Sequence, residues 1–260
     1  MRNFLSVLTA AGLLVLGSAA AGFSPVIAAE TSLVEKGRYL VTAGGCVSCH
    51  TDYKKKEKPY AGGAPIPTPF GTFYPPNITP DKTHGIGAWS DADFVRAMRE
   101  GKRPDGAHYF PAFPYTSYTK ATEEGLKAMK AYLFSIAAVS EPSTPHDISF
   151  PFSWRFLQTG WKLLFFREGV FEADPAQSAE VNRGAYLANA LGHCGECHTP
   201  RNMLGGLDYD QWMAGTPVGP EGEAIPNLTP DTKTGLTWSV PEIVEYLKSG
   251  QTPDFDYAGS

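Results

Sequence analysis

The sequence predicts a mostly α-helical protein made of two tandem domains of short helices and long loops, the second of them incomplete. Five sequence landmarks occur twice at nearly constant separation, and both copies contain helix-capping patterns. Gly and Pro number 27 and 22 of the 260 residues, which indicates long loops. The net charge of −5 argues against nucleic acid as a partner.

The first 29 residues are interpreted as an export signal. Arg2 supplies a basic start, the stretch from Phe4 to Leu16 is largely apolar, and small residues such as Ala19-Ala20-Ala21 suit a cleavage site. The alternative is an uncleaved anchor helix, which the glycines in this stretch disfavour. We therefore expect the protein in the periplasm or on the outer face of the cytoplasmic membrane, with any membrane association of the mature protein indirect.

An internal repeat divides the remaining chain into two copies of one domain. Each second landmark follows the first by 147 to 150 residues. The paired landmarks begin at Gly37 and Gly184, Cys46 and Cys194, Asn77 and Asn227, Trp89 and Trp238, and Gly101 and Gly250. The first domain is placed at residues 30–140, a linker rich in Pro and aromatic residues at 141–176, and the second domain at 177–260.

Capping patterns predict where the helices begin and end. The predicted capping boxes are Ser32 with Glu35, Ser90 with Asp93, and Ser239 with Glu242. Gly101 and Gly250 lie where the last two of these helices should end in a left-handed conformation. A further helix is expected after Thr122, with Leu126, Met129, Leu133 and Ile136 as its apolar face.

The linker contains a dense run of apolar residues from Trp154 to Phe166. Its simplest interpretation is a segment that packs across both domains. The alternative is a docking surface for a partner protein, because aromatic side chains concentrate at interfaces.

All four cysteines belong to two Cys-x-x-Cys-His motifs, which predict covalent haem. The two thiols of a motif can add to the vinyl groups of one haem, and the next residue, His, then becomes the proximal iron ligand. A redox dithiol would not occur twice with His behind it, and each domain would supply only half of a zinc site. The attachment residues are Cys46 and Cys49 for the first haem and Cys194 and Cys197 for the second, with His50 and His198 as proximal ligands.

Several further stretches of the sequence indicate which protein family the chain resembles. They include Asn77–Asp81, Gly85–Trp89, Phe110–Tyr115, Phe150–Phe152 and Cys194–Arg201. With these stretches the chain resembles, over nearly all of its length after the signal, the multihaem cytochrome c subunits of bacterial membrane-associated dehydrogenases. These dehydrogenases include alcohol and aldehyde dehydrogenases and nicotinate-type molybdenum hydroxylases. The resemblance implies two cytochrome c domains with two covalent haem c groups. It also implies electron transfer from a catalytic dehydrogenase subunit toward a quinone or a terminal oxidase, with no catalysis by this chain.

The chain departs from the family pattern at the sixth iron ligand. Many relatives have Met between Pro-Ala and Pro-Tyr, where this chain has Phe113, which cannot bind iron. His108 is then the candidate distal ligand of the first haem, and the alternatives are His84 and an open iron. Met98 and Met129 lie on apolar helix faces and are expected in the core.

The second departure is the end of the sequence at Ser260, before the position that corresponds to Phe113. We therefore expect the second domain to lack its distal ligand, and the chain to be a fragment of a longer one that could carry a third haem.

Two other functions stay open at this point. One is a dihaem enzyme, either a peroxidase or a thiosulfate-oxidising cytochrome, that acts at an open first haem. Phe113 favours it, whereas no acid–base group is evident beside that haem. The other is a free-standing electron shuttle with no dedicated partner.

Overall fold

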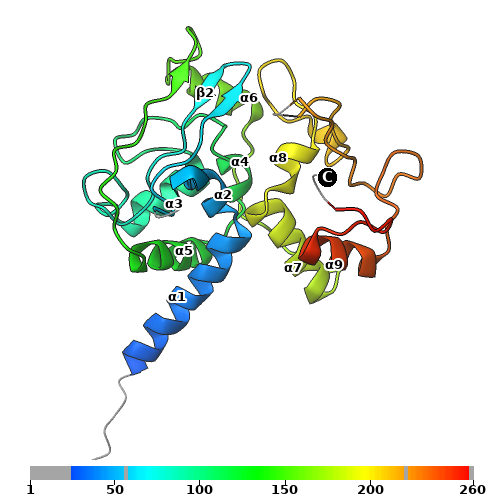
Figure 1. Cartoon of the computed structure of the whole chain (residues 1–260), viewed down its shortest axis with the longest axis horizontal. Coiled ribbons are helices and arrows are strands. Elements are labelled where there is room, and N and C mark those ends of the chain that lie inside the picture. The colour runs from blue at the N-terminus through cyan, green and yellow to red at the C-terminus, as the bar shows by residue number, and fades with distance from the viewer. Residues whose placement is uncertain (1–24, 56–57, 220–221, 258–260) are drawn as a thin grey trace, which may run out of the picture.

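The computed structural model describes residues 25–55, 58–219 and 222–257. Most of the predicted export signal, residues 1–24, lies outside the described residues. The described chain is mostly helical, as predicted, and Figure 1 shows two halves that lie side by side. Within the described ranges, no helix is long and apolar enough to cross a membrane.

The first half is built on the packing of α1 (Pro25–Ala43) against α5 (Glu123–Ser135). Its other helical elements are α2 (Cys46–His50), η1 (Tyr53–Lys55), α3 (Asp91–Glu100) and α4 (Tyr115–Tyr118). The buried core contains Leu40 and Val41 of α1, together with Leu126, Met129 and Leu133 of α5. The core position predicted for Met129 is therefore confirmed, as is that of Met98, which is 6% exposed on α3.

Most predicted helix ends are confirmed. Ser90 and Asp93 form the capping box of α3, and Gly101 ends that helix with φ 59°. Thr122 caps α5 by accepting a hydrogen bond from the backbone N–H of Gly125 at 3.1 Å.

The predicted capping box of the first helix is wrong. Because α1 begins at Pro25, both Ser32 and Glu35 lie inside it. A capping residue needs a non-helical backbone, whereas the preceding residues Ala28 and Ala29 favour continuation of the helix. The side chain of Glu35 instead accepts a hydrogen bond from Arg38 at 3.0 Å, one turn further along α1.

A small antiparallel sheet was not predicted. Its strands are β1 (Ile66–Thr68), β2 (Gly71–Phe73) and β3 (Asp147–Ile148), in the order β1-β2-β3. A Cβ at Gly71 would lie 2.3 Å from the carbonyl oxygen of Asp147, so glycine allows the close approach of β3. The start of the predicted linker is thus a strand of the first half.

The rest of the linker contacts both halves through α6 (Leu157–Phe165). The Lys162 ammonium donates to the carbonyl oxygen of Gly101 at 2.8 Å in the first half. The Trp161 indole donates to the carbonyl oxygen of Leu204 at 2.8 Å in the second half. The prediction that this segment packs across both halves is therefore confirmed. Several of its large apolar residues stay exposed, namely Phe150, Trp154, Phe156, Leu163 and Leu164.

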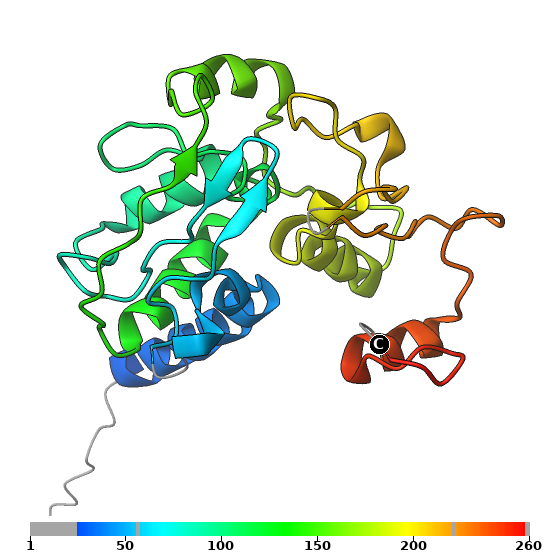
Figure 2. The same cartoon turned by 45° about the horizontal axis from the view of Figure 1, so that its top comes forward.

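The second half begins with α7 (Ala179–Tyr186), which continues into a π-helical turn, η2 (Leu187–Leu191). It then contains α8 (Cys194–His198), η3 (Tyr209–Gln211) and α9 (Val240–Ser249). Tyr186, Ala190 and Leu191 belong to the same buried cluster as the core of the first half. By contrast, none of the residues of α9 is buried, and in the turned view this helix stands apart from α7 (Figure 2).

Candidate haem sites

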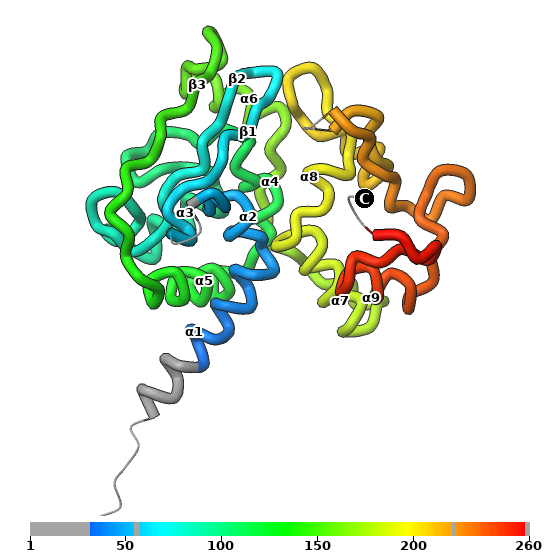
Figure 3. The backbone as a smooth tube through the Cα atoms, viewed as in Figure 1, coloured from blue at the N-terminus to red at the C-terminus, as the bar shows by residue number. Residues whose placement is uncertain are grey.

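The two Cys-x-x-Cys-His motifs form the short helices α2 and α8, which lie on the facing sides of the two halves (Figure 3). One helical turn places the first Cys, the second Cys and the His of each motif on neighbouring positions of one face. All four thiols are free: Cys46 and Cys194 are partly buried, whereas Cys49 and Cys197 are exposed. Each motif therefore offers two unpaired thiols beside one imidazole, as covalent haem requires.

The imidazoles of both motifs are held by backbone carbonyl groups. The Nδ1 atom of His50 lies 2.7 Å from the carbonyl oxygen of Pro76, and that of His198 lies 2.8 Å from the carbonyl oxygen of Pro226. Because a carbonyl can only accept, Nδ1 must carry the proton, and Nε2 is left with its lone pair free. This is the tautomer and the second contact that metal-binding histidines need, so both residues fit an iron ligand.

The repeated Asn-x-Thr-Pro-Asp stretches place these carbonyl groups. The Asn77 amide oxygen accepts from the N–H of Thr79 at 2.9 Å, and its NH₂ donates to the carbonyl oxygen of Val139 at 2.7 Å. The Asn227 amide oxygen likewise accepts from the N–H of Thr229 at 2.8 Å. Sequence reasoning missed the role of Pro76 and Pro226, although the signal was present: a Pro precedes the Asn in both copies.

One more hydrogen bond beside the haem motif occurs at the corresponding position in both halves. In the first half the N–H of Tyr60 donates to the hydroxyl of Thr51 at 3.1 Å. In the second half the N–H of Met213 donates to the hydroxyl of Thr199 at 3.0 Å. Tyr60 and Met213 both adopt a left-handed backbone, with φ 63° and 61°. Met213 is therefore the counterpart of Tyr60 in the loop.

The thiols are not activated as a redox dithiol would be. Burial raises the pKa of Cys46 to about 12, and it also raises the pKa of Cys49, Cys194 and Cys197. A reactive dithiol needs a lowered pKa, so these shifts disfavour the redox-dithiol alternative. Electrostatic repulsion from Cys197 contributes to the raised pKa of Cys49, which indicates that the two motifs lie within electrostatic range of each other.

Phe113 packs against the buried core of the first half, as do Cys46 and Val47 of the first haem motif. Its ring centroid is 5.8 Å from that of Tyr118, and the Tyr118 hydroxyl donates to the carbonyl oxygen of Gly44 at 2.9 Å, two residues before Cys46. The aromatic ring of Tyr109 also contacts Phe113, at 5.2 Å between centroids. The position at which the family resemblance led us to expect Met is thus apolar, and it packs against the same core as the first haem motif.

His108 lies against α6. Its Nε2 is 3.3 Å from the hydroxyl of Thr159, and its carbonyl oxygen accepts from Arg155 at 2.8 Å. Burial, followed by the charges of Lys162 and Lys102, lowers the pKa of His108. Its role as distal ligand stays a prediction. The backbone of His84, the other candidate, is held by the carboxylate of Asp81 in a turn.

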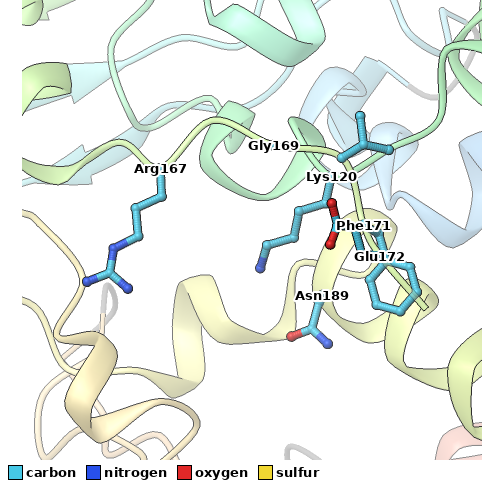
Figure 4. A pocket seen from close by; sticks show the side chains of 7 residues that line it. Lys120, Arg167, Gly169, Phe171, Glu172 and Asn189 are labelled. Carbon is cyan, nitrogen blue, oxygen red and sulfur yellow. The ribbon is translucent and has the colours of Figure 1, made fainter. Parts of the chain in front are cut away.

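A pocket of about 330 Å³ opens near α8 at the junction of the halves, with Lys120 and Arg167 pointing into it (Figure 4). Its lining consists of Lys120, Arg167, Gly169, Val170, Phe171, Glu172 and Asn189. None of these residues belongs to a Cys-x-x-Cys-His motif.

Residues 34–137 match the cytochrome c family. The chain is 44% identical to the protein named diheme cytochrome c-type of Cereibacter sphaeroides, over 97% of this chain and 88% of that protein. It is 43% identical to a nicotinate dehydrogenase subunit of Pseudomonas putida, over 85% of this chain and 18% of that one. It is 39% identical to the fructose dehydrogenase cytochrome subunit of Gluconobacter japonicus, over 87% of this chain and 46% of that protein. The chain thus spans less than half the length of the last two relatives.

Proposed function

This chain belongs to the cytochrome c family, and we propose that it is a dihaem member that carries electrons from a partner dehydrogenase toward a quinone or a terminal oxidase. The observation that carries this proposal is the pair of matching imidazole contacts, His50 with Pro76 and His198 with Pro226. Both leave Nε2 free to bind an iron, so each half has the residues for one haem.

The residues of the chain have separate tasks in such a relay. Cys46 and Cys49 would hold the first haem, Cys194 and Cys197 the second, and His50 and His198 would bind the two irons. A bound haem supplies an iron that accepts and releases one electron at a time. The protein contributes the fixed imidazole, the burial around the motif and the relative placement of the two sites.

The partner is inferred from the relatives. Several are named cytochrome subunits of dehydrogenases that act on alcohol, fructose or gluconate. A catalytic dehydrogenase subunit would donate electrons to this chain, and the exposed apolar residues around α6, such as Leu163 and Leu164, are available for such a contact. The export signal predicted from the sequence supports a location in the periplasm or on the outer face of the cytoplasmic membrane.

The haem sites are tested by expressing the chain with a c-type maturation system. We expect a protein that keeps its haem stain after denaturation and whose mass includes two haems. The double variant Cys46→Ala with Cys49→Ala should retain the second haem firmly and lose covalent retention of the first, and Cys194→Ala with Cys197→Ala should show the reverse. A protein of apo mass would refute the proposal.

Electron transfer is tested by mixing the loaded protein with its cognate dehydrogenase and that enzyme's substrate. We expect rapid reduction of both haems in the mixture, and negligible oxidation of alcohol, aldehyde or thiosulfate by the isolated chain. Substantial turnover by the isolated chain would instead support the enzyme alternative, which Phe113 favours.

The sixth position of the first iron is tested by Phe113→Met. Because Phe113 packs against the same core as the first motif, we expect the new thioether to bind the iron and to produce the sulfur-to-iron charge-transfer absorption. Carbon monoxide binding should then weaken relative to the wild type. His108→Ala is the companion variant: conversion of the first haem to high spin would show that His108 leaves Thr159 and binds the iron.

A further inference from the structure

The carboxylate of Glu196, in the second haem motif, is hydrogen-bonded to the first half of the molecule. Glu196 lies between Cys194 and Cys197, yet its carboxylate accepts hydrogen bonds from the hydroxyls of Thr116 and Ser117, which belong to α4. The bond from Ser117 measures 2.9 Å. The residue that lies inside the second motif is thus bound by the helix that follows Phe113.

The second carboxylate oxygen of Glu196 is bound within its own half. It accepts from the Arg201 guanidinium at 2.5 Å, and Arg201 also donates to the carbonyl oxygens of Glu196 and Gly205 at 3.0 and 2.8 Å. The Glu196 side chain is only 8% exposed. Exposed ion pairs contribute little, whereas a desolvated carboxylate whose two oxygens are both bound is costly to leave unpaired.

Other contacts close the same junction. The ring of His193, the residue before the second motif, packs edge-on against Tyr118 with 5.7 Å between centroids. Tyr118 in turn donates to Gly44, just before the first motif. On the other side, the Lys120 ammonium lies 4.9 Å from the ring centre of Trp212, whose ring covers Gly195 of the second motif. Glu196 therefore sits in the middle of a contact that joins both motifs.

We propose that Glu196 is a positioning residue: through Thr116 and Ser117 it fixes the second haem motif against the first half, and through its charge it offsets Arg201 beside the second haem. This inference rests on the haem sites proposed above. Fixing the two motifs in one arrangement would fix the separation of the two haems, on which electron exchange between them depends. The negative charge of Glu196 would partly cancel the positive charge of Arg201. It would therefore make reduction of the second iron less favourable than Arg201 without this carboxylate would.

The two parts of the proposal are separated by three variants of the full, haem-loaded chain. Glu196→Ala removes both the hydrogen bonds and the charge. Glu196→Gln keeps an acceptor oxygen for Thr116 and Ser117 but removes the charge. The double variant Thr116→Val with Ser117→Ala keeps the Glu196–Arg201 pair and removes the donors of the first half. Glu245→Ala, on the exposed surface of α9, is the control.

Three measurements apply to each variant: the midpoint potential of each haem, the magnetic coupling between the oxidised haems in electron paramagnetic resonance, and amide hydrogen exchange over residues 190–197. Glu196→Ala should raise the potential of the second haem, weaken the coupling and accelerate exchange by about tenfold. Glu196→Gln should raise the potential with coupling and exchange near wild type. The double variant should weaken coupling and accelerate exchange, with a smaller change of potential.

The haem content of each protein is measured first, after denaturation. A wild-type chain without two covalent haems would refute the proposed function. With two haems present, unchanged coupling and exchange in both Glu196→Ala and the double variant would overturn the docking role. An unchanged second-haem potential in Glu196→Gln would overturn the charge role.

Discussion

Helix α3 in the first half and its counterpart α9 in the second have the same caps and different surroundings. Both begin with a capping box, at Ser90 and Ser239, and both end at a left-handed glycine, Gly101 with φ 59° and Gly250 with φ 78°. Yet α3 buries residues against α4 and α5, whereas no residue of α9 is buried. The caps act within one helix and need no partner, so they form in both halves.

The first helices of the two halves differ in the same way. A Cβ at Gly37 of α1 would lie 1.9 Å from the carbonyl oxygen of Ala128 on α5, whereas a Cβ at Gly184 of α7 would meet no atom within 4 Å. The described residues after α9 contain no helix that corresponds to α5. The glycine recurs in the sequence, but of its two copies only Gly37 packs closely against another helix among the described residues, which is α5.

This comparison shows that the hydrogen bonds around a haem motif and the core beneath it are separate features. The imidazole contacts, the Asn turns and the loop bonds recur in both halves, although within the described part of the chain most residues of the buried core belong to the first half. The second half instead shares that core through η2 and meets the first half at Glu196.

The largest expected difference in stability between the halves follows substitution of Gly37 in α1 and of Gly184 in α7. Gly37→Ala places a methyl group against the backbone of α5, so α1 and α5 must separate, and we expect a loss of about 3 kcal/mol or more in the free energy of unfolding. Gly184→Ala should stabilise α7 by up to about 1 kcal/mol, because Ala favours the helix and finds open space. Denaturant unfolding followed by far-UV circular dichroism measures both; equal effects would break the comparison.

A second pair of substitutions compares the apolar faces of α3 and α9. Met98 is 6% exposed and its counterpart Leu247 is 77% exposed. Met98→Ala should cost about 2 kcal/mol through lost burial and the cavity left behind, whereas Leu247→Ala should change stability by less than about 0.5 kcal/mol. The same unfolding experiment applies. A large loss for Leu247→Ala would show that this face of α9 is covered in solution.

The smallest effect concerns the capping carboxylates. Hydrogen bonds from Ser90 lower the pKa of Asp93, and those from Ser239 lower the pKa of Glu242. A carboxyl group whose pKa is lowered by folding stabilises the fold above its unfolded pKa of about 4, and this contribution is lost as the pH falls through the lowered value. Asp93→Asn and Glu242→Gln should each flatten the decline of stability on acidification. Unfolding at pH 7 and pH 3 checks this, and an unchanged pH dependence in both would contradict it.

The haem motifs, the repeat and most helix ends could be predicted from the sequence, because each depends on residues close together in the chain. The five-residue motif determines where its thiols and imidazole lie, and a capping box needs only four residues. The one failed cap, at Ser32, failed because the residues before it also favour a helix, and local pattern alone does not decide between the two. The strand at Asp147 was missed because it is only two residues long and forms by pairing with a distant hairpin.

By itself, then, the sequence predicted the two haem motifs, and it determined the duplication and the local turns of this protein. The tertiary structure alone decided that Pro76 and Pro226 hold the imidazoles, that His108 contacts α6 while Phe113 packs against the core of the first half, and that Glu196 joins the halves. Each of these contacts connects residues that are well separated along the chain. Their partners are selected by burial and by the need to satisfy buried polar groups, and only the folded arrangement of helices brings such groups together.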